Sequence, residues 1–359
     1  MVLAIHTEAV ANIVGRAELL ALFFSLLALF YGHAQRYGWS ALWFLLAVLS
    51  KESAAASAPL LLWQAWAFHK NSIRDVFKKI WPVVFAGLLY IGLRYIALAG
   101  HLVSVDVGYA YNPLAFSSYI TQLATALKVM LLLIAKTIVP FTLSADYSFN
   151  QIPLVISLFS PYVVGGILVL LGFVSMAIWS KTRATAIGWS AAMFLLSYFI
   201  VSNFIFVIGT IMAERIMYAP SLAIAVVMGW LFANSYNGKR TTKIITAVIF
   251  AVFIVFQALI LVNRNPVWAS ETVLFTAMAH TAPNSVQAQT LLAQNLFKRG
   301  EWAEGREAMQ RAKAIYPDHL SLIFTETVIA VHDKKLKEAK DVYLIILSMR
   351  PTHTAARWN

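Results

Sequence analysis

Long apolar runs separated by short polar segments fill the first three quarters of the chain. The runs long enough to cross a bilayer as helices cover residues 10–32, 80–98, 157–180, 186–209, 216–234 and 243–263. A helix satisfies its backbone hydrogen bonds internally, as lipid requires, so these runs predict transmembrane helices. After Asn263 such runs end and charged residues recur regularly.

Residues 39–68 are apolar except for Ser50-Lys51-Glu52-Ser53 at their centre. One long span would place Lys51 and Glu52 in the middle of the bilayer, where charges are costly. Two short spans would place them at the far surface and would keep the flanking basic residues on one side. The basic residues concerned are Arg36, Lys70, Arg74, Lys78 and Lys79. Because basic loops favour the cytoplasmic side, we expect two short spans.

The same rule orients the rest of the chain. It places Lys181, Arg183, Lys239, Arg240 and Lys243 inside, and the N-terminus, residues 99–118, residues 213–218 and the tail outside. Residues 119–139 conflict with this orientation, because a span there would invert everything that follows. Lys128 and Lys136 interrupt this segment, so a re-entrant or interfacial pair of helices is the alternative.

Composition divides the chain into two parts. Only 12% of the residues are charged, against about 25% in soluble domains. Residues 1–263 contain 16 Lys/Arg and 7 Asp/Glu, and residues 264–359 contain 12 and 9. We therefore expect a membrane domain at 1–263, with about eight or nine membrane segments, and a water-soluble tail at 264–359. The net charge of +12 lies largely in short loops, which indicates membrane orientation and not nucleic-acid binding. The chain has no cysteine, which excludes disulfides and thiolate sites.

A period of 34 residues runs through the tail. The aligned positions are Pro283, Pro317 and Pro351; Trp268, Trp302 and Leu336; and Phe275, Met309 and Tyr343. Thirty-four residues is the length of a tetratricopeptide repeat, a helical hairpin that buries its apolar face on its neighbours. We expect about two and a half repeats, with Gly300 in a turn. The fold class is thus all-α: a polytopic membrane bundle followed by an α-solenoid. An ordinary amphipathic helix pair is the plainer alternative.

Charged residues are scarce before residue 264, so each is a candidate site residue. The seven acidic ones are Glu8, Glu18, Glu52, Asp75, Asp106, Asp146 and Glu214. All except Asp75 fall on the side predicted to be outside, together with arginine and lysine residues. Arginine binds phosphate through two hydrogen bonds, and a carboxylate can accept a hydroxyl proton, so this mixture suits a phosphate-bearing lipid. Structural ion pairing between helices is the plainer alternative.

Residues 6–20, H-T-E-A-V-A-N-I-V-G-R-A-E-L-L, resemble the signature of the transmembrane and tetratricopeptide-repeat containing O-mannosyltransferases and their bacterial relatives. Further matching segments are Ser50-Lys51-Glu52, Leu93-Arg94, Asn112-Pro113, residues 143–148 and residues 214–221. The resemblance covers nearly the whole chain. It implies a GT-C glycosyltransferase that moves a mannose-like sugar from a polyprenyl- or dolichyl-phosphate donor to a protein hydroxyl outside the cytoplasm, with inversion at the sugar carbon.

The resemblance also suggests roles for particular residues. Arg16, Arg94 and Arg215, with Lys51, would bind the lipid phosphate; His6 and Glu8 would line the pocket; Glu214 would orient Arg215; and Asp146, Tyr147 and Tyr218 would face the acceptor. No metal site and no cofactor beyond the lipid-linked sugar are predicted. The expected partners are the bilayer, the donor and an acceptor protein bound by the repeats.

Two features depart from the family pattern. The key acidic residue of GT-C enzymes follows their first transmembrane helix, and we expect that loop and two helices to precede Met1. Tyr111 replaces the aspartate that often precedes the Asn-Pro pair. A non-catalytic membrane anchor that displays a protein-binding array is therefore the main alternative, and a transporter is a third. The absence of cysteine favours a bacterial inner membrane with a periplasmic tail; in a eukaryote the tail would be lumenal in the endoplasmic reticulum.

Overall fold

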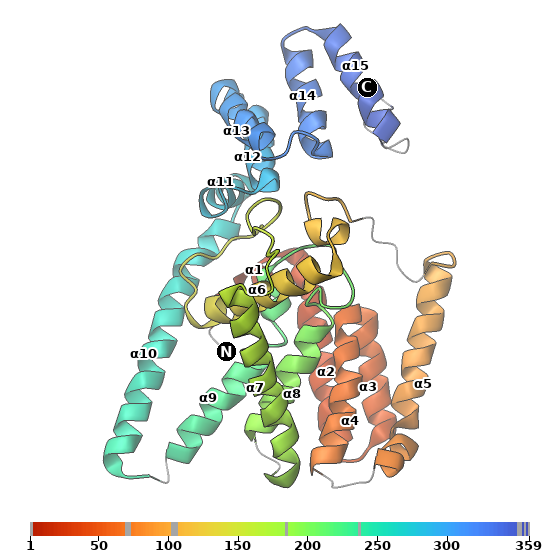
Figure 1. Ribbon diagram of the computed structural model, residues 1–359, viewed down its shortest axis with the longest axis vertical. Coiled ribbons are helices and arrows are strands. Elements are labelled where there is room, and N and C mark those ends of the chain that lie inside the picture. Colours follow the sequence, from red (N-terminus) through yellow and green to blue (C-terminus); the bar gives the residue numbers. More distant parts are fainter. Residues whose placement is uncertain are drawn as a thin grey trace.

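The computed structural model describes residues 3–68, 73–101, 107–183, 186–235 and 238–349, together with residues 354 and 357. Lys70, Asp106 and Pro351, to which the sequence predictions refer, lie outside the described residues, as does most of 355–359. Within the described ranges the regular structure is helical, with no strand. Figure 1 shows a bundle of upright helices with a second group of helices above it.

Eight upright helices form the bundle. They are α2 (Arg16–His33), α3 (Tyr37–Ser50), α4 (Ser57–Phe68), α5 (Ile73–Ala97), α7 (Pro161–Arg183), α8 (Ala186–Phe199), α9 (Leu222–Ser235) and α10 (Arg240–Arg264). Four of these, and the crosswise α6, are long and apolar enough to cross a membrane. The outer faces of α5 and α10 carry exposed side chains such as Leu88, Val252 and Leu259. Water would penalise such a surface and lipid does not, so the protein is an integral membrane protein.

The apolar segment interrupted by Lys51 forms two helices, as predicted. Helix α3 ends at Ser50, a short 3-10 helix covers Glu52–Ala56, and α4 begins at Ser57. The 14 residues of α3 rise about 21 Å, which is less than the roughly 30 Å of a hydrocarbon core. Helices α3 and α4 both pack against other helices of the bundle, and Lys51, which lies between them, is at one end of it.

Successive upright helices alternate in direction, so their connections gather at two ends (Figure 1). At the lower end, here called the basic end, the helix termini and connections carry Arg36, Arg74, Lys78, Lys79, Lys181, Arg183, Lys239, Arg240 and Lys243. The opposite end, here called the site end, carries residues 3–15 and 200–221 and lies below the tail. The structure thus groups the basic residues as the charge rule predicted.

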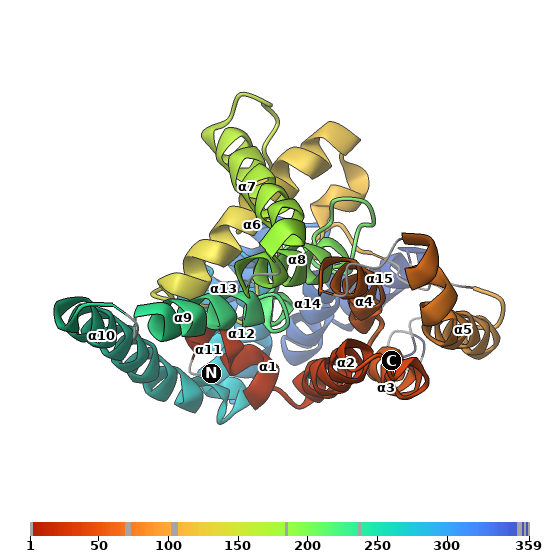
Figure 2. The ribbon, with the colours of Figure 1, turned by 90° about the horizontal axis from the view of Figure 1, so that it is seen from below.

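Helix α6 (Tyr119–Ile138) lies crosswise at the site end, as both views of the bundle show (Figures 1 and 2). Its Lys128 donates to the Pro153 carbonyl at 2.8 Å, and Lys136 donates to Thr142. Both lysines therefore donate hydrogen bonds to the loop that follows the helix. The predicted pair of helices is a single helix here, and its crosswise course leaves the orientation of α7–α10 unchanged.

One buried glutamine of α10 holds the N-terminal segment and the end of α6 together. Gln257 is fully buried and accepts the Ala4 amide at 3.0 Å. Its Nε2 donates to the carbonyls of Thr137 and Ile138 at 3.0 and 3.1 Å. Because a buried amide must find partners, this residue fixes three separate segments of the chain at the site end.

Above the site end, the tail is a helical solenoid. Its helices are α11 (Glu271–Thr281), α12 (Val286–Lys298), α13 (Trp302–Ile315), α14 (Leu320–His332) and α15 (Leu336–Met349). Helices α12 and α14 begin 34 residues apart, and so do α13 and α15, so the period of the sequence is the period of the hairpins. Gly300 and Lys334 occupy equivalent turns, and both have positive φ, 79° and 59°.

Candidate functional site

Arg215 is held at the site end by a buried glutamate from the opening segment. Its guanidinium donates to Glu8 Oε1, and its backbone N–H donates to Glu8 Oε2 at 2.9 Å. The Glu8 side chain is 1% exposed, whereas that of Arg215 is 37% exposed. The carboxylate thus lies inside, and the outer face of the guanidinium remains accessible. Such an arrangement can orient a cation toward an anionic ligand.

Glu214 pairs with Arg264 and not with Arg215. Arg264 Nη2 lies 3.0 Å from Glu214 Oε2, and the Tyr147 hydroxyl and the Ser144 amide donate to Oε1 at 2.6 and 2.5 Å. The prediction that Glu214 orients Arg215 directly was wrong, because Glu8 takes that position. Burial raises the pKa of Glu214 to about 7, and the Arg264 guanidinium and the Tyr147 hydroxyl oppose that rise.

Two further pairs stand where the chain crosses from α3 to α4. Lys51 pairs with Glu18 of α2, whose other oxygen lies 3.5 Å from the Ser53 hydroxyl. Glu52 and Arg94 form a longer pair, 3.9 Å between Oε2 and Nη1. The side chain of Lys51 is more exposed than that of Glu18, which repeats the arrangement of Arg215 over Glu8. Lys51 and Arg94 are therefore partly neutralised but accessible.

Arg16 lies at the start of α2 and is exposed. The structure places it at the site end, as the sequence predicted. Among the described residues no ion pair to its guanidinium is found. It is therefore an exposed cation next to the opening segment.

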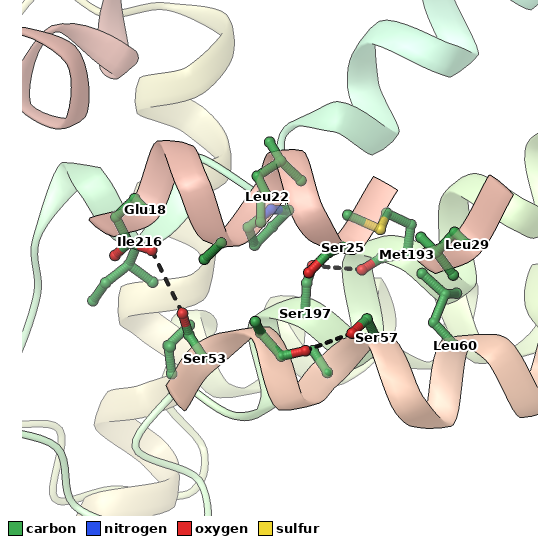
Figure 3. A pocket seen from close by; sticks show the side chains of 16 residues that line it. Glu18, Leu22, Ser25, Leu29, Ser53, Ser57, Leu60, Met193, Ser197 and Ile216 are labelled. Carbon is green, nitrogen blue, oxygen red and sulfur yellow. Dashed lines mark hydrogen bonds between the residues drawn. The ribbon is translucent and has the colours of Figure 1, made fainter. Parts of the chain in front are cut away.

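A narrow cavity opens between α2, α4 and α8 (Figure 3). Glu18 and Ser53 stand at one end of its lining, and the side chains of Ser25, Ser57 and Ser197 line it farther along. The Ser57 and Ser197 hydroxyls donate to backbone carbonyls within their own segments. The enclosed space is about 40 Å³, enough for about three water molecules. A ligand larger than water would have to bind at its mouth.

A larger cavity of about 390 Å³ is lined in part by Tyr218 and Leu222, which follow Arg215 in the chain. Its polar lining residues are His6, Thr7, Tyr218 and Asn265, and its remaining lining is apolar. The residues that follow Arg215 thus face both cavities, since Ile216, Ala219 and Pro220 line the narrow one and Tyr218 lines the larger one. A cavity of this size with a few polar groups is typical of a small-molecule site.

The larger cavity adjoins an apolar groove between α9 and α10. Leu3 and Leu222 line both spaces, and the groove is otherwise lined by Ile224, Ala225, Met228, Phe250, Phe253 and Ile254. Helices α9 and α10 lie side by side at one edge of the bundle (Figure 2). A cavity with a few polar lining residues that adjoins an apolar groove matches the chemistry of an amphiphile.

His6 lies in the wall of the larger cavity and is neutral. Its Nε2 lies 2.7 Å from the Ser221 hydroxyl, and its ring meets that of Tyr218 edge to face at 5.0 Å. Burial lowers the pKa of His6 to about 4, so at neutral pH the ring carries no charge. His6 can therefore bind polar groups by hydrogen bonding but adds no cation for a phosphate.

Asp146 and Tyr147 face away from the cavities just described. Asp146 accepts the Ser148 amide at 2.9 Å, the Ser148 hydroxyl at 2.7 Å and the hydroxyl of Ser285 in the tail. Burial raises the pKa of Tyr147, so its hydroxyl keeps its proton and donates to Glu214. Tyr218, in contrast, lines the larger cavity.

Three important residues were missed from the sequence. Arg264 reads as an ordinary charge at the end of a membrane helix, Gln257 as a single polar residue in an apolar run, and Ser144 as a loop residue. In the structure the Arg264 guanidinium and the Ser144 backbone amide donate to Glu214, and the Gln257 side chain binds the N-terminal segment. Only Gln257 gave a usable signal, because a polar side chain inside a membrane helix needs a partner. No group of three or more metal-binding side chains is found within the described ranges.

The chain is homologous to curated protein O-mannosyl-transferases of the TMTC family. It is 24% identical to human protein O-mannosyl-transferase TMTC3, over 97% of this chain and 42% of that protein. It is 25% identical to protein O-mannosyl-transferase F38B6.6 of Caenorhabditis elegans, over 82% of this chain and 42% of the relative. Human TMTC4 is 26% identical over 82% of this chain and 45% of the relative. The chain thus spans less than half the length of these relatives. No family model and no solved structure matches it.

Proposed function

We propose that this homologue of the TMTC protein O-mannosyl-transferases is a membrane glycosyltransferase. It would transfer a mannose-like sugar from a polyprenyl- or dolichyl-phosphate donor to protein hydroxyls on the non-cytoplasmic side. The names of the relatives support the class of reaction. The observation that carries the proposal is the larger cavity, which Tyr218, three residues after Arg215, helps to line and which shares Leu3 and Leu222 with the apolar groove between α9 and α10.

The shape of this space fits a lipid-linked sugar. The isoprenoid chain would lie along the groove and gain from burial of apolar surface. The sugar and phosphate would occupy the larger cavity, where Thr7, Tyr218 and Asn265 offer hydrogen bonds. Arg215 is one short helical turn from Tyr218, whose amide donates to the Arg215 carbonyl at 3.0 Å. We assign Arg215 to the phosphate, because its outer face is accessible and Glu8 orients it.

In the transfer, an acceptor hydroxyl oxygen attacks the C1 atom of the sugar, and the bond between C1 and the phosphate oxygen breaks. The polyprenyl phosphate leaves with the bonding electrons, and the hydroxyl proton passes to a base. Charge grows on the phosphate as this bond breaks, so a fixed guanidinium stabilises the transition state. Glu8, Glu18, Glu52 and Glu214 each hold a cation, and we assign them to positioning and not to proton transfer.

A transfer assay tests this function. The protein in lipid nanodiscs is given radiolabelled mannosyl-phosphoryl-polyprenol and detergent-extracted cell protein, and label in protein is counted. Exchanging Glu8 and Arg215 together for glutamine removes the cation without leaving a buried charge, and should lower transfer about a hundredfold. Arg306→Gln, which breaks a tail ion pair with Asp333 at 2.6 Å, is the matched control and should transfer normally.

The groove makes a separate prediction about the lipid chain. Ala225 lines it, so Ala225→Trp should obstruct a long isoprenoid. We expect weaker use of a long-chain donor and unchanged use of a donor with a short chain. Equal loss for both donors would place the lipid elsewhere. Transfer absent from the unaltered protein, although it binds the donor, would favour the alternative of a membrane-anchored scaffold.

The orientation is also a proposal: the basic end faces the cytoplasm and the site end the opposite compartment, as the charge rule predicts. Because the chain has no cysteine, single cysteines can report it. Gly38 is exposed at the basic end, and Ala115 is exposed at the site end. In intact bacterial cells, a thiol reagent that cannot cross the inner membrane should label only Ala115→Cys. Labelling of Gly38→Cys alone would reverse the orientation.

We further propose that the tail is an array of tetratricopeptide repeats that presents the acceptor protein. The 34-residue hairpin period supports the repeat type. The tail stands directly above the site end in Figure 1, so a protein bound to it would be near the larger cavity. Binding in the array would supply the proximity that a hydroxyl acceptor needs.

A further inference from the structure

A single loop, residues 143–151, stands between the Glu214 pair and the first hairpin of the tail. On the membrane side it offers three groups to that pair. The Leu143 carbonyl accepts Arg264 Nη1 at 2.7 Å, and the Ser144 amide and Tyr147 hydroxyl donate to Glu214. Glu214 is 0% exposed, so these groups replace water for its carboxylate.

The other side of the same loop is bonded to the tail at five points, one of which is the Asn284 amide donating to Gln151 Oε1 at 3.1 Å. The Thr281 hydroxyl lies 3.0 Å from the Ser144 hydroxyl, and the Ser285 hydroxyl donates to Asp146. Two backbone bonds follow: Val286 N to Phe149 O at 2.7 Å, and Asn150 N to Asn284 O at 2.8 Å. Ser285 also caps α12, accepting the amide of Ala288, so the beginning of α12 is part of this junction.

Asp146 organises the loop from its centre. Its two oxygens accept the amide and hydroxyl of Ser148 as well as the hydroxyl of Ser285. Three donors on one carboxylate stabilise a single conformation of the loop. The hydrogen bonds of Asp146 are with the loop and the tail, and among the described residues it forms no hydrogen bond or ion pair with Glu214 or Arg215. It therefore acts on the site through the backbone that connects it to Ser144 and Tyr147.

We propose that Asp146 is a positioning residue: it docks the first hairpin through Ser285 and thereby fixes the loop that holds Glu214 and, one residue on, Arg215. The tail is then part of the phosphate site, and undocking of the hairpin loosens Arg215. The catalytic consequence rests on the proposed transfer function. The mechanical link from Ser285 to the segment around Arg215 does not.

Hydrogen–deuterium exchange on the protein in nanodiscs tests the link without requiring activity. In Asp146→Asn one accepting oxygen becomes an amide group, which cannot accept the Ser285 or Ser148 hydrogen. We expect backbone amides in residues 213–218 to exchange about tenfold faster, as well as those in residues 284–286. Ser270→Ala, which removes the equivalent cap of α11 outside this junction, is the matched control and should leave 213–218 unchanged.

A second pair of variants guards against a general loss of folding. Ser285→Ala removes the donor to Asp146, and Ser285→Thr restores a hydroxyl. Faster exchange in residues 213–218 with alanine, reversed with threonine, supports the proposal. Faster exchange confined to residues 284–286 in both Asp146→Asn and Ser285→Ala would overturn it.

The transfer assay tests the catalytic consequence of the proposal. In Asp146→Asn we expect the donor KM to rise about tenfold more than that of the Ser270→Ala control, because the docked loop positions the phosphate-binding arginine. An unchanged donor KM beside faster exchange in residues 213–218 would overturn the catalytic half and leave the mechanical half standing. If the unaltered protein transfers no sugar, the proposed function fails, and the exchange result still decides the link.

Discussion

The Glu8 carboxylate lies beneath Arg215 and accepts hydrogen bonds from both the guanidinium and the backbone amide of Arg215. The two residues are 207 positions apart in the sequence. The pair is asymmetric, with the carboxylate 1% exposed and the arginine 37% exposed. The inner member is therefore fixed by its surroundings, and the outer member can meet a ligand. The account of the site depends on this asymmetry.

The asymmetry predicts unequal costs for the two single exchanges. Arg215→Gln leaves a buried carboxylate without its cation, whereas Glu8→Gln leaves a guanidinium that water can reach. We expect Arg215→Gln to destabilise the protein by about 2 kcal/mol more than Glu8→Gln. The double exchange should recover part of that difference. Thermal unfolding in detergent measures all three. Equal costs would show that the carboxylate is not effectively buried.

Because His6 is buried and neutral, we expect the folded protein to lose stability in acid. Its folded pKa is lowered to about 4 by burial, from an ordinary value near 6.5. Its contribution is therefore complete above pH 6.5 and is lost as the pH falls through that value toward 4, because the unfolded chain binds the proton first. The fall in Tm between pH 7.5 and pH 5 should be smaller in His6→Gln than in the unaltered protein. An identical fall would contradict a buried neutral His6.

The opening motif, residues 6–20, contains Gly15, and the packing around this residue explains why a glycine stands there. A Cβ at this position would lie 2.0 Å from the Ala9 carbonyl oxygen, so a side chain would force the turn that carries Glu8 to open. We expect Gly15→Ala to destabilise the protein by about 2 kcal/mol or more, measured as a lower Tm. Gly229 of α9 has nothing within 4 Å of its added Cβ. Gly229→Ala should therefore be neutral or slightly stabilising, and a comparable loss there would remove the steric explanation.

The two equivalent turns of the tail predict opposite effects of glycine. Lys334 has φ 59°, a left-handed conformation that costs a side chain about 1 kcal/mol and costs glycine little. Lys334→Gly should therefore raise stability by about 1 kcal/mol, and Gly300→Ala should lower it by a similar amount. Lys340→Gly, beyond the first turn of α15, should lower it as a helix-interior glycine does. Urea denaturation followed by tail tryptophan fluorescence measures the three. Destabilisation by Lys334→Gly would contradict the equivalence of the turns.

The fold could largely be predicted from the sequence because hydrocarbon imposes simple requirements. The run that forms α10 had to be a helix, and Lys51 could not remain in the middle of one span, so α3 and α4 separate there. The crosswise course of α6 could not be settled, because its lysines are solvated by loop carbonyls that only the fold brings near.

The gathering of the candidate residues at one end of the bundle could be predicted from the sequence, and their pairing could not. Glu8 belongs to the matching segment at residues 6–20, and Glu214 and Arg215 belong to the one at residues 214–221. The structure brings all three to one end of the bundle. Which carboxylate meets which cation depends on positions in three dimensions, so Arg264 was missed and Glu214 was given the wrong partner. The resemblance suggests the acceptor side for Asp146, and its hydrogen bond with Ser285 follows from how the tail docks.

The most direct measurement of the central claim is the binding of polyprenyl phosphate to the protein in nanodiscs, by native mass spectrometry or by calorimetry. The unaltered protein is compared with the Glu8→Gln/Arg215→Gln double exchange and with Arg36→Gln at the basic end. We predict that the double exchange weakens binding at least about tenfold, as loss of a charge-assisted contact should, and that Arg36→Gln binds normally. Equal affinity of the double exchange and the unaltered protein would contradict a lipid-phosphate site at Arg215.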